Sequence, residues 1–311
     1  MEFLSQYGLF LLKSITIVIA ILMVVAGVFA INHKPKPKME IKSLNEEYSD
    51  VKSLMHKTIL KDKLPKPKKS KEKKPTLYVI EFDGDMKASQ VEQLREEVTA
   101  VLSIAEKNDE VLIKLESPGG SVNGYGLAAA QLQRIRDTSI PLTVCIDKVA
   151  ASGGYLMACV ANTIIAAPFA IIGSIGVVAQ IPNFHKWLKN NDIDVELLTA
   201  GEYKRTLTLF GENTPAGRKK FQEDLEKIHT QFRNYVLTNR SNLDIEKVAT
   251  GEHWLASDAF ALKLVDRLLT SDEYLINKMV THQAFKLSIK PKMSLINKLL
   301  KPAMRILHPW G

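Results

Sequence analysis

The sequence predicts an α/β fold with a mainly parallel sheet, preceded by one N-terminal transmembrane helix. Two patterns support this prediction. Strand-like and helix-like segments alternate between residues 77 and 239, and an uncharged, almost wholly apolar run occupies residues 14–31. Repeated strand-then-helix units favour right-handed crossovers and therefore parallel strands. The apolar run approaches the roughly 20 residues that a helix needs to cross a bilayer.

The N-terminal run favours an uncleaved membrane anchor over residues 1–31. A cleaved signal peptide is the alternative, but the run is long, and a Lys- and Pro-rich stretch follows it instead of an A-x-A cleavage site. Residues 32–75 are predicted to be a linker with one short helix between residues 39 and 60. Their composition cannot bury enough apolar surface to fold alone.

A catalytic domain is predicted over residues 76–287. Its expected strands are residues 77–82, 111–115, 142–146, 163–167 and 194–199. Its expected helices are residues 89–107, a helix ending near Arg136, short pieces near 152–161 and 183–190, and a long helix over 214–239. The first helix is expected to start with a capping box at Ser89 and Glu92, and the last to open at Thr214-Pro215.

The net charge of +8 is concentrated at the two ends of the chain. Residues 1–75 hold fifteen lysines against seven acidic residues, and residues 288–311 hold five basic residues and no acid. The domain between them is therefore acidic, with 22 basic against 27 acidic residues. A nucleic-acid enzyme would carry its basic surface on the folded domain, so we expect no nucleic-acid partner. The basic ends are instead typical of segments that face lipid headgroups.

Residues 288–311 form a predicted basic amphipathic tail, with apolar residues such as Leu295 and Leu299 among the lysines. Such a tail could lie on an anionic membrane surface. The alternative is a loosely docked tail interrupted by Pro302.

Three loops after predicted strands carry residue types suited to catalysis. Residues 116–122 (ESPGGSV) place two glycines after a proline and can present N–H groups to a ligand, although a purely structural turn is the alternative. Residues 147–155 place Ser152 among small residues at a helix N-terminus, where an ordinary N-cap is the alternative. Residues 199–206 contain Lys204, which taken alone is a solvated charge.

Together these loops resemble the signal peptide peptidase A family of membrane serine proteases, most closely its SohB branch, over about residues 77–270. The motifs are A-S-G-G-Y, G-x-Y-K, S-P-G-G and G-S-I-G-V. The resemblance implies that Ser152 is the nucleophile and Lys204 the general base, that Gly120 and Gly153 form the oxyanion hole, and that Ser174 orients the lysine. It also implies a ClpP/crotonase-like spiral of ββα units and homo-oligomers. One departure is Lys263 before Leu264-Val265-Asp266, where the family tends to have Gly; it concerns only a helix end.

Residue chemistry is consistent with a serine–lysine pair. None of the seven histidines lies in the three loops, although His185 and His253 could fold back toward them. A lysine that acts as a base must be neutral, which requires burial against apolar neighbours. Candidates for this apolar wall are Ile175, Val177 and residues 164–172. Cys145 and Cys159 lie in apolar sequence and are expected to be buried, and we expect neither a metal nor an organic cofactor.

These expectations describe a membrane-anchored serine endopeptidase that hydrolyses signal-peptide-like or membrane-associated polypeptides. The alternatives are a crotonase-like acyl-CoA enzyme, which shares the implied fold, and a catalytically inactive membrane scaffold. The resemblance implies that this membrane is a bacterial inner membrane. The lysines after Ile31 favour a cytoplasmic domain, whereas the resemblance implies a periplasmic one, which we expect because long domains can translocate against this bias.

Overall fold

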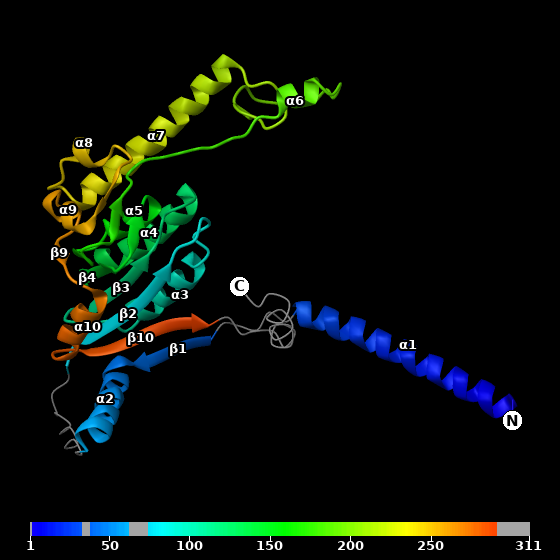
Figure 1. The fold of residues 1–311 in the computed structure, drawn as a ribbon, viewed down its shortest axis with the longest axis horizontal. Helices are drawn as coiled ribbons and strands as arrows, with labels where there is room; N and C mark the ends of the chain where they lie inside the picture. The colour runs from blue at the N-terminus through cyan, green and yellow to red at the C-terminus, as the bar shows by residue number, and fades with distance from the viewer. Residues whose placement is uncertain (1, 33–37, 62–73, 291–311) are drawn as a thin grey trace. The chain divides into compact units, whose positions relative to one another are not determined.

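The computed structural model describes residues 2–32, 38–61 and 74–290. The chain divides into two compact units, one of residues 1–40 with 289–311 and one of Ile41–Ser288. Helix α1 (Glu2–Asn32) covers the apolar run in the first unit (Figure 1). Among the described residues, no helix reaches the length and hydrophobicity that a membrane crossing needs. The N-terminal transmembrane helix therefore stays a prediction.

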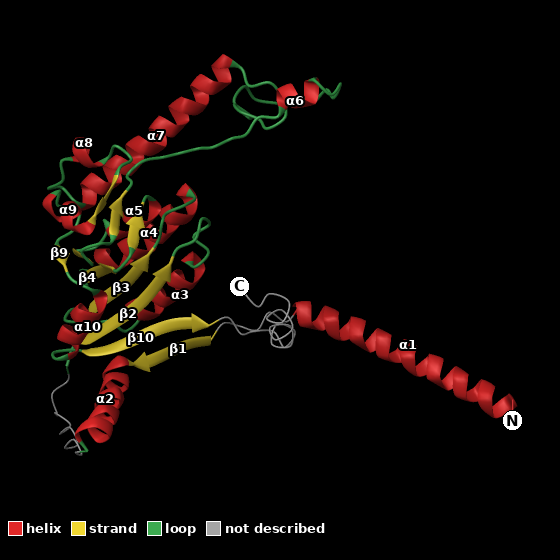
Figure 2. Ribbon diagram, in the orientation of Figure 1, coloured by secondary structure: helices red, strands yellow, loops and turns green. Residues whose placement is uncertain are grey.

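The larger sheet has seven strands in the order β1-β10-β2-β3-β4-β6-β9. Every neighbouring pair from β10 to β9 is parallel, which confirms the predicted α/β class with a mainly parallel sheet (Figure 2). The strands are β1 (Lys38–Ser43), β2 (Thr76–Asp83), β3 (Glu110–Glu116), β4 (Leu142–Ile146), β6 (Thr163–Ala166), β9 (Arg267–Leu268) and β10 (Gln283–Lys290). Strand β10 runs three residues into the predicted tail, and the rest of that tail, residues 291–311, lies outside the described residues.

A smaller sheet has the order β5-β7-β8, with β5 (Val149–Ala151), β7 (Ile171–Gly173) and β8 (His253–Leu255). Strands β5 and β7 are parallel, and β7 and β8 are antiparallel. The chain passes from the larger to the smaller sheet twice, from β4 to β5 and from β6 to β7. The succession β4-β5-α5 is a ββα unit, whereas the closer likeness to ClpP and crotonases stays a prediction.

The helices that follow the strands lie largely where the sequence predicts them. Helix α7 begins as expected, because Thr214 Oγ1 accepts the Gly217 N–H at 3.1 Å and Pro215 occupies the first helical position. In the predicted linker, α2 (Leu44–Met55) continues into the π-helical η1 (His56–Leu60), while residues 33–37 and 62–73 lie outside the described part. The remaining helices are α3 (Val91–Leu102), α4 (Val122–Asp137), α5 (Gly153–Ala158), α6 (His185–Lys189), α7 (Pro215–Asn239), α8 (Ile245–Val248), α9 (Ala256–Ala261) and α10 (Ser271–Met279).

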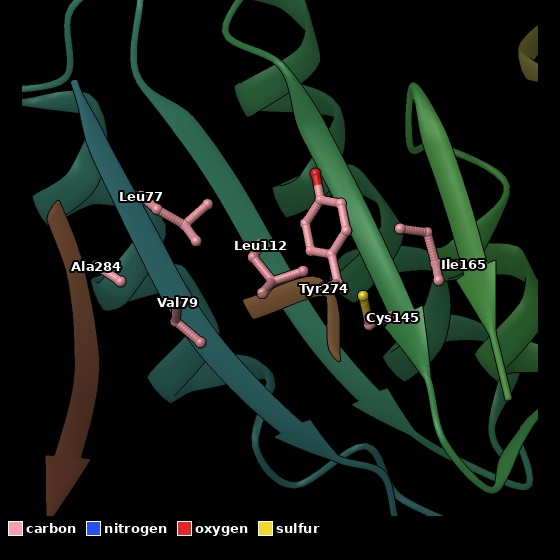
Figure 3. Close-up of a cluster of buried hydrophobic side chains, with 7 residues drawn as sticks. All are labelled: Leu77, Val79, Leu112, Cys145, Ile165, Tyr274 and Ala284. Atoms are coloured by element: carbon pink, nitrogen blue, oxygen red, sulfur yellow. The ribbon is translucent and has the colours of Figure 1, made fainter. Parts of the chain in front are cut away.

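A buried cluster covers one face of the larger sheet (Figure 3). Parallel strands that are buried on both faces have nearly continuous apolar sequences, so strands β2, β3, β4 and β6 could be predicted from the sequence. Both cysteines are buried and free, as predicted. The cluster consists of Leu77, Val79, Leu112, Cys145, Ile165, Tyr274 and Ala284.

Two local predictions are wrong. Residues 194–199 form no strand, and Leu198 is 89% exposed. The segment between β7 and α7 projects from the sheets in Figure 1, so these residues have no strand edge with which to exchange hydrogen bonds. The helix expected over residues 89–107 is the shorter α3, and it has no capping box, because Ser89 Oγ donates to Asp85 Oδ2 at 2.6 Å.

Candidate active site

The predicted S-P-G-G turn follows β3 and is fixed to the smaller sheet. Ser117 donates its N–H to Val149 O at 2.8 Å and accepts the Ala151 N–H at 3.0 Å. Gly119 has a φ of +90°, which glycine adopts without the penalty that other residues meet. Pro118 before a residue of positive φ is the pattern of a type II turn. The backbone therefore turns sharply just after the carboxyl end of β3.

Ser152 occupies a strained corner between β5 and α5. Its φ is 52° and its ψ is −117°, a region that non-glycine residues seldom adopt. The Ser152 N–H donates to Gly173 O at 2.8 Å, so strand pairing holds this conformation. The side chain is half-buried, and helix α5 begins at the next residue, Gly153.

The two turns touch each other. A Cβ built on Gly119 would lie 2.7 Å from Ser152 Cβ and 2.8 Å from Gly153 N, so only a glycine fits this approach. Among the described residues, neither the Gly120 N–H nor the Gly153 N–H has a hydrogen-bond partner. The structure thus brings Ser152 and the two predicted oxyanion-hole residues to neighbouring segments, with neither of the two amides hydrogen-bonded to another described residue.

Ser174 follows the strand that pairs with β5. Ala151 and Gly173 are the last registered pair of β5 and β7, so Ser152 and Ser174 are the next residue on each strand. Both serines have a φ of 52°. The Ser174 N–H donates to Glu252 O at 2.6 Å, which fixes the turn to the chain just before β8. Ser174 and Ser152 therefore both lie at the carboxyl end of the pair of strands β5 and β7.

The structure does not bring Lys204 to Ser152. Lys204 lies in an exposed turn, where its N–H donates to Gly201 O at 3.2 Å. Its side chain makes no hydrogen bond or ion pair within the described parts of the chain. Of the predicted apolar wall, Ile164, Ile172 and Ile175 are buried, but Lys204 is solvent-exposed.

One of the two alternative histidines does approach the carboxyl end of β7. His253 lies in β8 opposite Gly173, the residue before Ser174. Its side chain is exposed, and its imidazole makes no hydrogen bond to a described residue. His185 starts α6 in the projecting segment. No group of three His, Cys, Asp or Glu side chains within residues 2–32, 38–61 and 74–290 could hold a metal ion.

Sequence reasoning missed Tyr125, which lies beneath both turns. It is fully buried on α4, and its hydroxyl is 2.6 Å from Ser117 Oγ. Burial raises the pKa of Tyr125, so the phenol stays protonated. The one sequence signal is a large polar aromatic residue one helical turn after Ser121, on the face that turns toward the sheet.

Comparison with known proteins identifies the family. The family described as "Peptidase family S49" matches residues 134–286, and "Peptidase family S49 N-terminal" matches residues 2–132. The chain is 46% identical to the probable protease SohB of Haemophilus influenzae over 100% of this chain and 97% of that protein. It is also 46% identical to a probable protease SohB of Buchnera aphidicola, over 89% of this chain and 100% of that protein.

Among solved structures, a mutant of the 1510-N membrane-bound stomatin-specific protease, in complex with a substrate peptide, matches 73% of this chain and 99% of that chain. The TM-score is 0.46 and the sequence identity 16%. The two family matches and the full-length relatives are decisive: the chain belongs to peptidase family S49.

Proposed function

We propose that the chain is a serine endopeptidase in which Ser152 is the nucleophile and Lys204 the general base. The observation that carries the proposal is the Ser152 backbone, at φ 52° and ψ −117° between a strand and a helix. Strain of this kind costs about 1–3 kcal/mol and gathers at functional sites. A sharp strand-to-helix turn also exposes a serine hydroxyl beside free backbone N–H groups.

In the proposed reaction, neutral Lys204 Nζ takes the Ser152 Oγ proton as that oxygen attacks the scissile carbonyl carbon. The N–H groups of Gly120 and Gly153 bind the resulting oxyanion. The Lys204 ammonium then protonates the leaving amine as the C–N bond breaks. Water, deprotonated by the same lysine, hydrolyses the acyl-enzyme and restores Ser152. Ser174 is proposed to orient the lysine.

Association of copies is part of the proposal, because the segment that carries Lys204 is apolar and exposed. Val178 is 90% exposed, Leu198 89% and Trp187 63%. Exposed apolar surface of this kind is typical of protein–protein interfaces. Burying it in a homo-oligomer would order the Lys204 loop against a Ser152 of the same or a neighbouring copy. Mixing inactive Ser152→Ala and Lys204→Ala chains separates the two cases, since activity returns only if the pair forms between copies.

Residues 1–31 are proposed to anchor the protein in a bacterial inner membrane, on the strength of the uncharged run over residues 14–31. The active site would then meet signal-peptide-like or membrane-associated polypeptides, the proposed substrates. We propose a periplasmic catalytic domain against the bias of the lysines after Ile31. A reporter fused after Gly311 and active only on one side of the membrane decides the orientation.

Intact-mass analysis after treatment with a serine-directed phosphonate tests the mechanism. The wild type is expected to gain one label per chain, Ser152→Ala none, and Lys204→Ala far less than the wild type at equal times. His253→Ala is the matched control for the neighbouring imidazole and should label like the wild type. Equal labelling of all four proteins contradicts the proposal. An unlabelled wild type favours an inactive scaffold or a crotonase-like enzyme.

A further inference from the structure

A chain of hydrogen bonds runs beneath the S-P-G-G turn. The Gly119 N–H donates to Ser117 Oγ at 3.1 Å, Ser117 Oγ is 2.6 Å from the Tyr125 hydroxyl, and that hydroxyl donates to Asp85 O at 2.9 Å. Ser117 and Tyr125 are both 0% exposed. Buried hydroxyls with all their partners in place hold a local structure rigidly, and removing one of them leaves the others unsatisfied.

The number of protons available fixes which group donates and which accepts in each of these hydrogen bonds. A phenol has one proton, and Tyr125 directs it to Asp85 O. Ser117 must therefore donate its own proton to the Tyr125 oxygen and accept the Gly119 N–H on a lone pair. Each group has a single consistent role. The Gly119 N–H is therefore already bonded to Ser117 Oγ. The next amide, that of Gly120, has no hydrogen-bond partner among the described residues.

Tyr125 also supports the other half of the oxyanion hole. A Cβ built on Gly153 would lie 2.3 Å from Tyr125 Cγ, so the ring lies directly against the backbone at the start of α5. A Cβ on Gly84 would lie 2.3 Å from both Ser117 Oγ and the Tyr125 hydroxyl, so the hydroxyl pair is closely enclosed. One side chain therefore contacts Gly153 with its ring and holds the Gly119–Gly120 turn through its hydroxyl.

We propose that Tyr125 is a positioning residue that sets the distance between the Gly120 and Gly153 amides, acting on the first through Ser117 and on the second through its ring. This inference rests on the proposed function, because it assigns those two amides to the oxyanion. Tyr125 does not touch the substrate. Its hydroxyl is expected to affect transition-state binding and to leave substrate binding unchanged, since an oxyanion hole is complementary to the transition state.

The test uses full-length Tyr125→Phe, Ser117→Ala and the double variant. Tyr274→Phe is the matched control, because Tyr274 is also buried and its hydroxyl lies 3.3 Å from Thr143 Oγ1, in the cluster on the larger sheet. The measurements are kcat and KM on a quenched fluorescent peptide with an apolar centre, the rate and final extent of phosphonate labelling, and the thermal midpoint.

Tyr125→Phe and Ser117→Ala are each expected to lower kcat by about 10- to 100-fold, less than the loss of a whole oxyanion donor, with KM within about twofold. Labelling should be slower but reach the wild-type extent. The double variant should be no slower than the slower single variant, because both substitutions break the same chain of hydrogen bonds. Tyr274→Phe should lower the thermal midpoint and leave kcat unchanged.

A wild-type kcat in Tyr125→Phe and Ser117→Ala overturns the inference. The inference is also overturned if the fraction of activity lost equals the fraction of chains that the phosphonate no longer labels. Such a result shows that part of the protein is unfolded, not that the amides are mispositioned. Failure of the proposed function has a different signature, since either the wild type would then stay unlabelled or Ser152→Ala would still react with the phosphonate. If Tyr125→Phe does not fold, Ser117→Ala alone carries the test, because it retains the ring against Gly153.

Discussion

The Ser152 N–H donates to the Gly173 carbonyl oxygen at 2.8 Å, one residue beyond the last registered pair of β5 and β7. This bond extends the ladder of the smaller sheet into a residue whose φ is 52°. Pairing of β5 with β7 therefore holds Ser152 in a conformation that its own backbone disfavours. The free energy of strand pairing in the smaller sheet therefore offsets the backbone strain at Ser152.

Ser152→Gly is expected to make the protein more stable and inactive. Glycine adopts positive φ freely, so the substitution relieves strain of about 1–3 kcal/mol and loses about 0.5–1 kcal/mol through the greater entropy of the unfolded chain. The expected gain is about 1 kcal/mol in the free energy of unfolding. Chemical denaturation of the full-length chain measures it. Ser152→Ala, which also lacks the hydroxyl, keeps the strain and should gain nothing. A Ser152→Gly variant that is less stable than Ser152→Ala by about 0.5–1 kcal/mol would show that no strain is stored, because only the entropy of glycine would then separate them.

Gly119→Ala is expected to destabilise the protein and slow phosphonate labelling. Its φ is +90°, and the added Cβ would lie 2.7 Å from Ser152 Cβ, so the turn must move away from Ser152. We expect a loss of about 2 kcal/mol or more, typical of overpacking combined with backbone strain.

Gly126→Ala is the matched control for that substitution. Gly126 lies within α4, and a Cβ there would meet nothing within 4 Å. Alanine should stabilise this helix by about 0.5–1 kcal/mol without changing the labelling rate. If both glycine variants behave alike in denaturation and labelling, the contact between the two turns has no role.

The elements that could be predicted are those whose sequence is shaped by burial alone. Strands β2, β3, β4 and β6 are buried apolar runs, and each candidate loop was placed by the strand expected before it. The predicted strand over residues 194–199 failed because a strand also needs a neighbour, and no local pattern specifies one. For the same reason the short β5, β7 and β8, which exist through pairing, were not expected.

Side-chain hydrogen bonds were the second source of error. Ser89 fits the pattern of a capping residue, but its hydroxyl binds Asp85 and α3 begins two residues later. The Ser117–Tyr125 pair joins residues whose meeting depends on how α4 packs against the turn that follows β3. Residue types at a given spacing suggest such bonds, and only the fold decides between the available acceptors.

Alkaline pH is expected to destabilise the protein through its buried thiols. Burial raises the pKa of Cys145 and of Cys159 to about 12, from an ordinary value near 9. Below pH 9 the thiols are protonated in both states, so their contribution to stability is fully present. Above it the unfolded chain loses protons that the folded chain keeps, and the free energy of unfolding falls by up to about 1.4 kcal/mol per pH unit for each thiol until pH 12.

Denaturant unfolding between pH 8 and 11 in the presence of a reductant measures this slope. Cys145→Ala and Cys159→Ala should each make it shallower, and the double variant should keep only the part due to tyrosines such as the half-buried Tyr235, whose pKa burial raises to about 12. The slope, not the absolute stability, is the readout, because each alanine also leaves a small cavity. An unchanged slope in the double variant would exclude the thiols as the cause.

The helix end at Lys263 gives a prediction about stability alone. Lys263 has a φ of 63° just after α9, its N–H donates to Phe260 O at 3.0 Å, and the Leu264 N–H donates to Ala259 O at 2.9 Å. These two bonds form a Schellman motif, whose left-handed position is usually glycine. Lys263→Gly should therefore raise the free energy of unfolding by about 0.5–1 kcal/mol, since the strain that it removes exceeds the added entropy of the unfolded chain.

Lys263→Ala separates backbone strain from the loss of the lysine side chain. Alanine removes the charge but retains a Cβ at positive φ, so this variant should not gain stability. Phosphonate labelling should match the wild type in both variants, because α9 contributes no residue to the candidate site. If Lys263→Gly is less stable than Lys263→Ala by about 0.5–1 kcal/mol in denaturant unfolding, only the entropy of glycine separates the two variants. The left-handed backbone at this helix end is then not strained, and the departure from glycine there has no energetic cost.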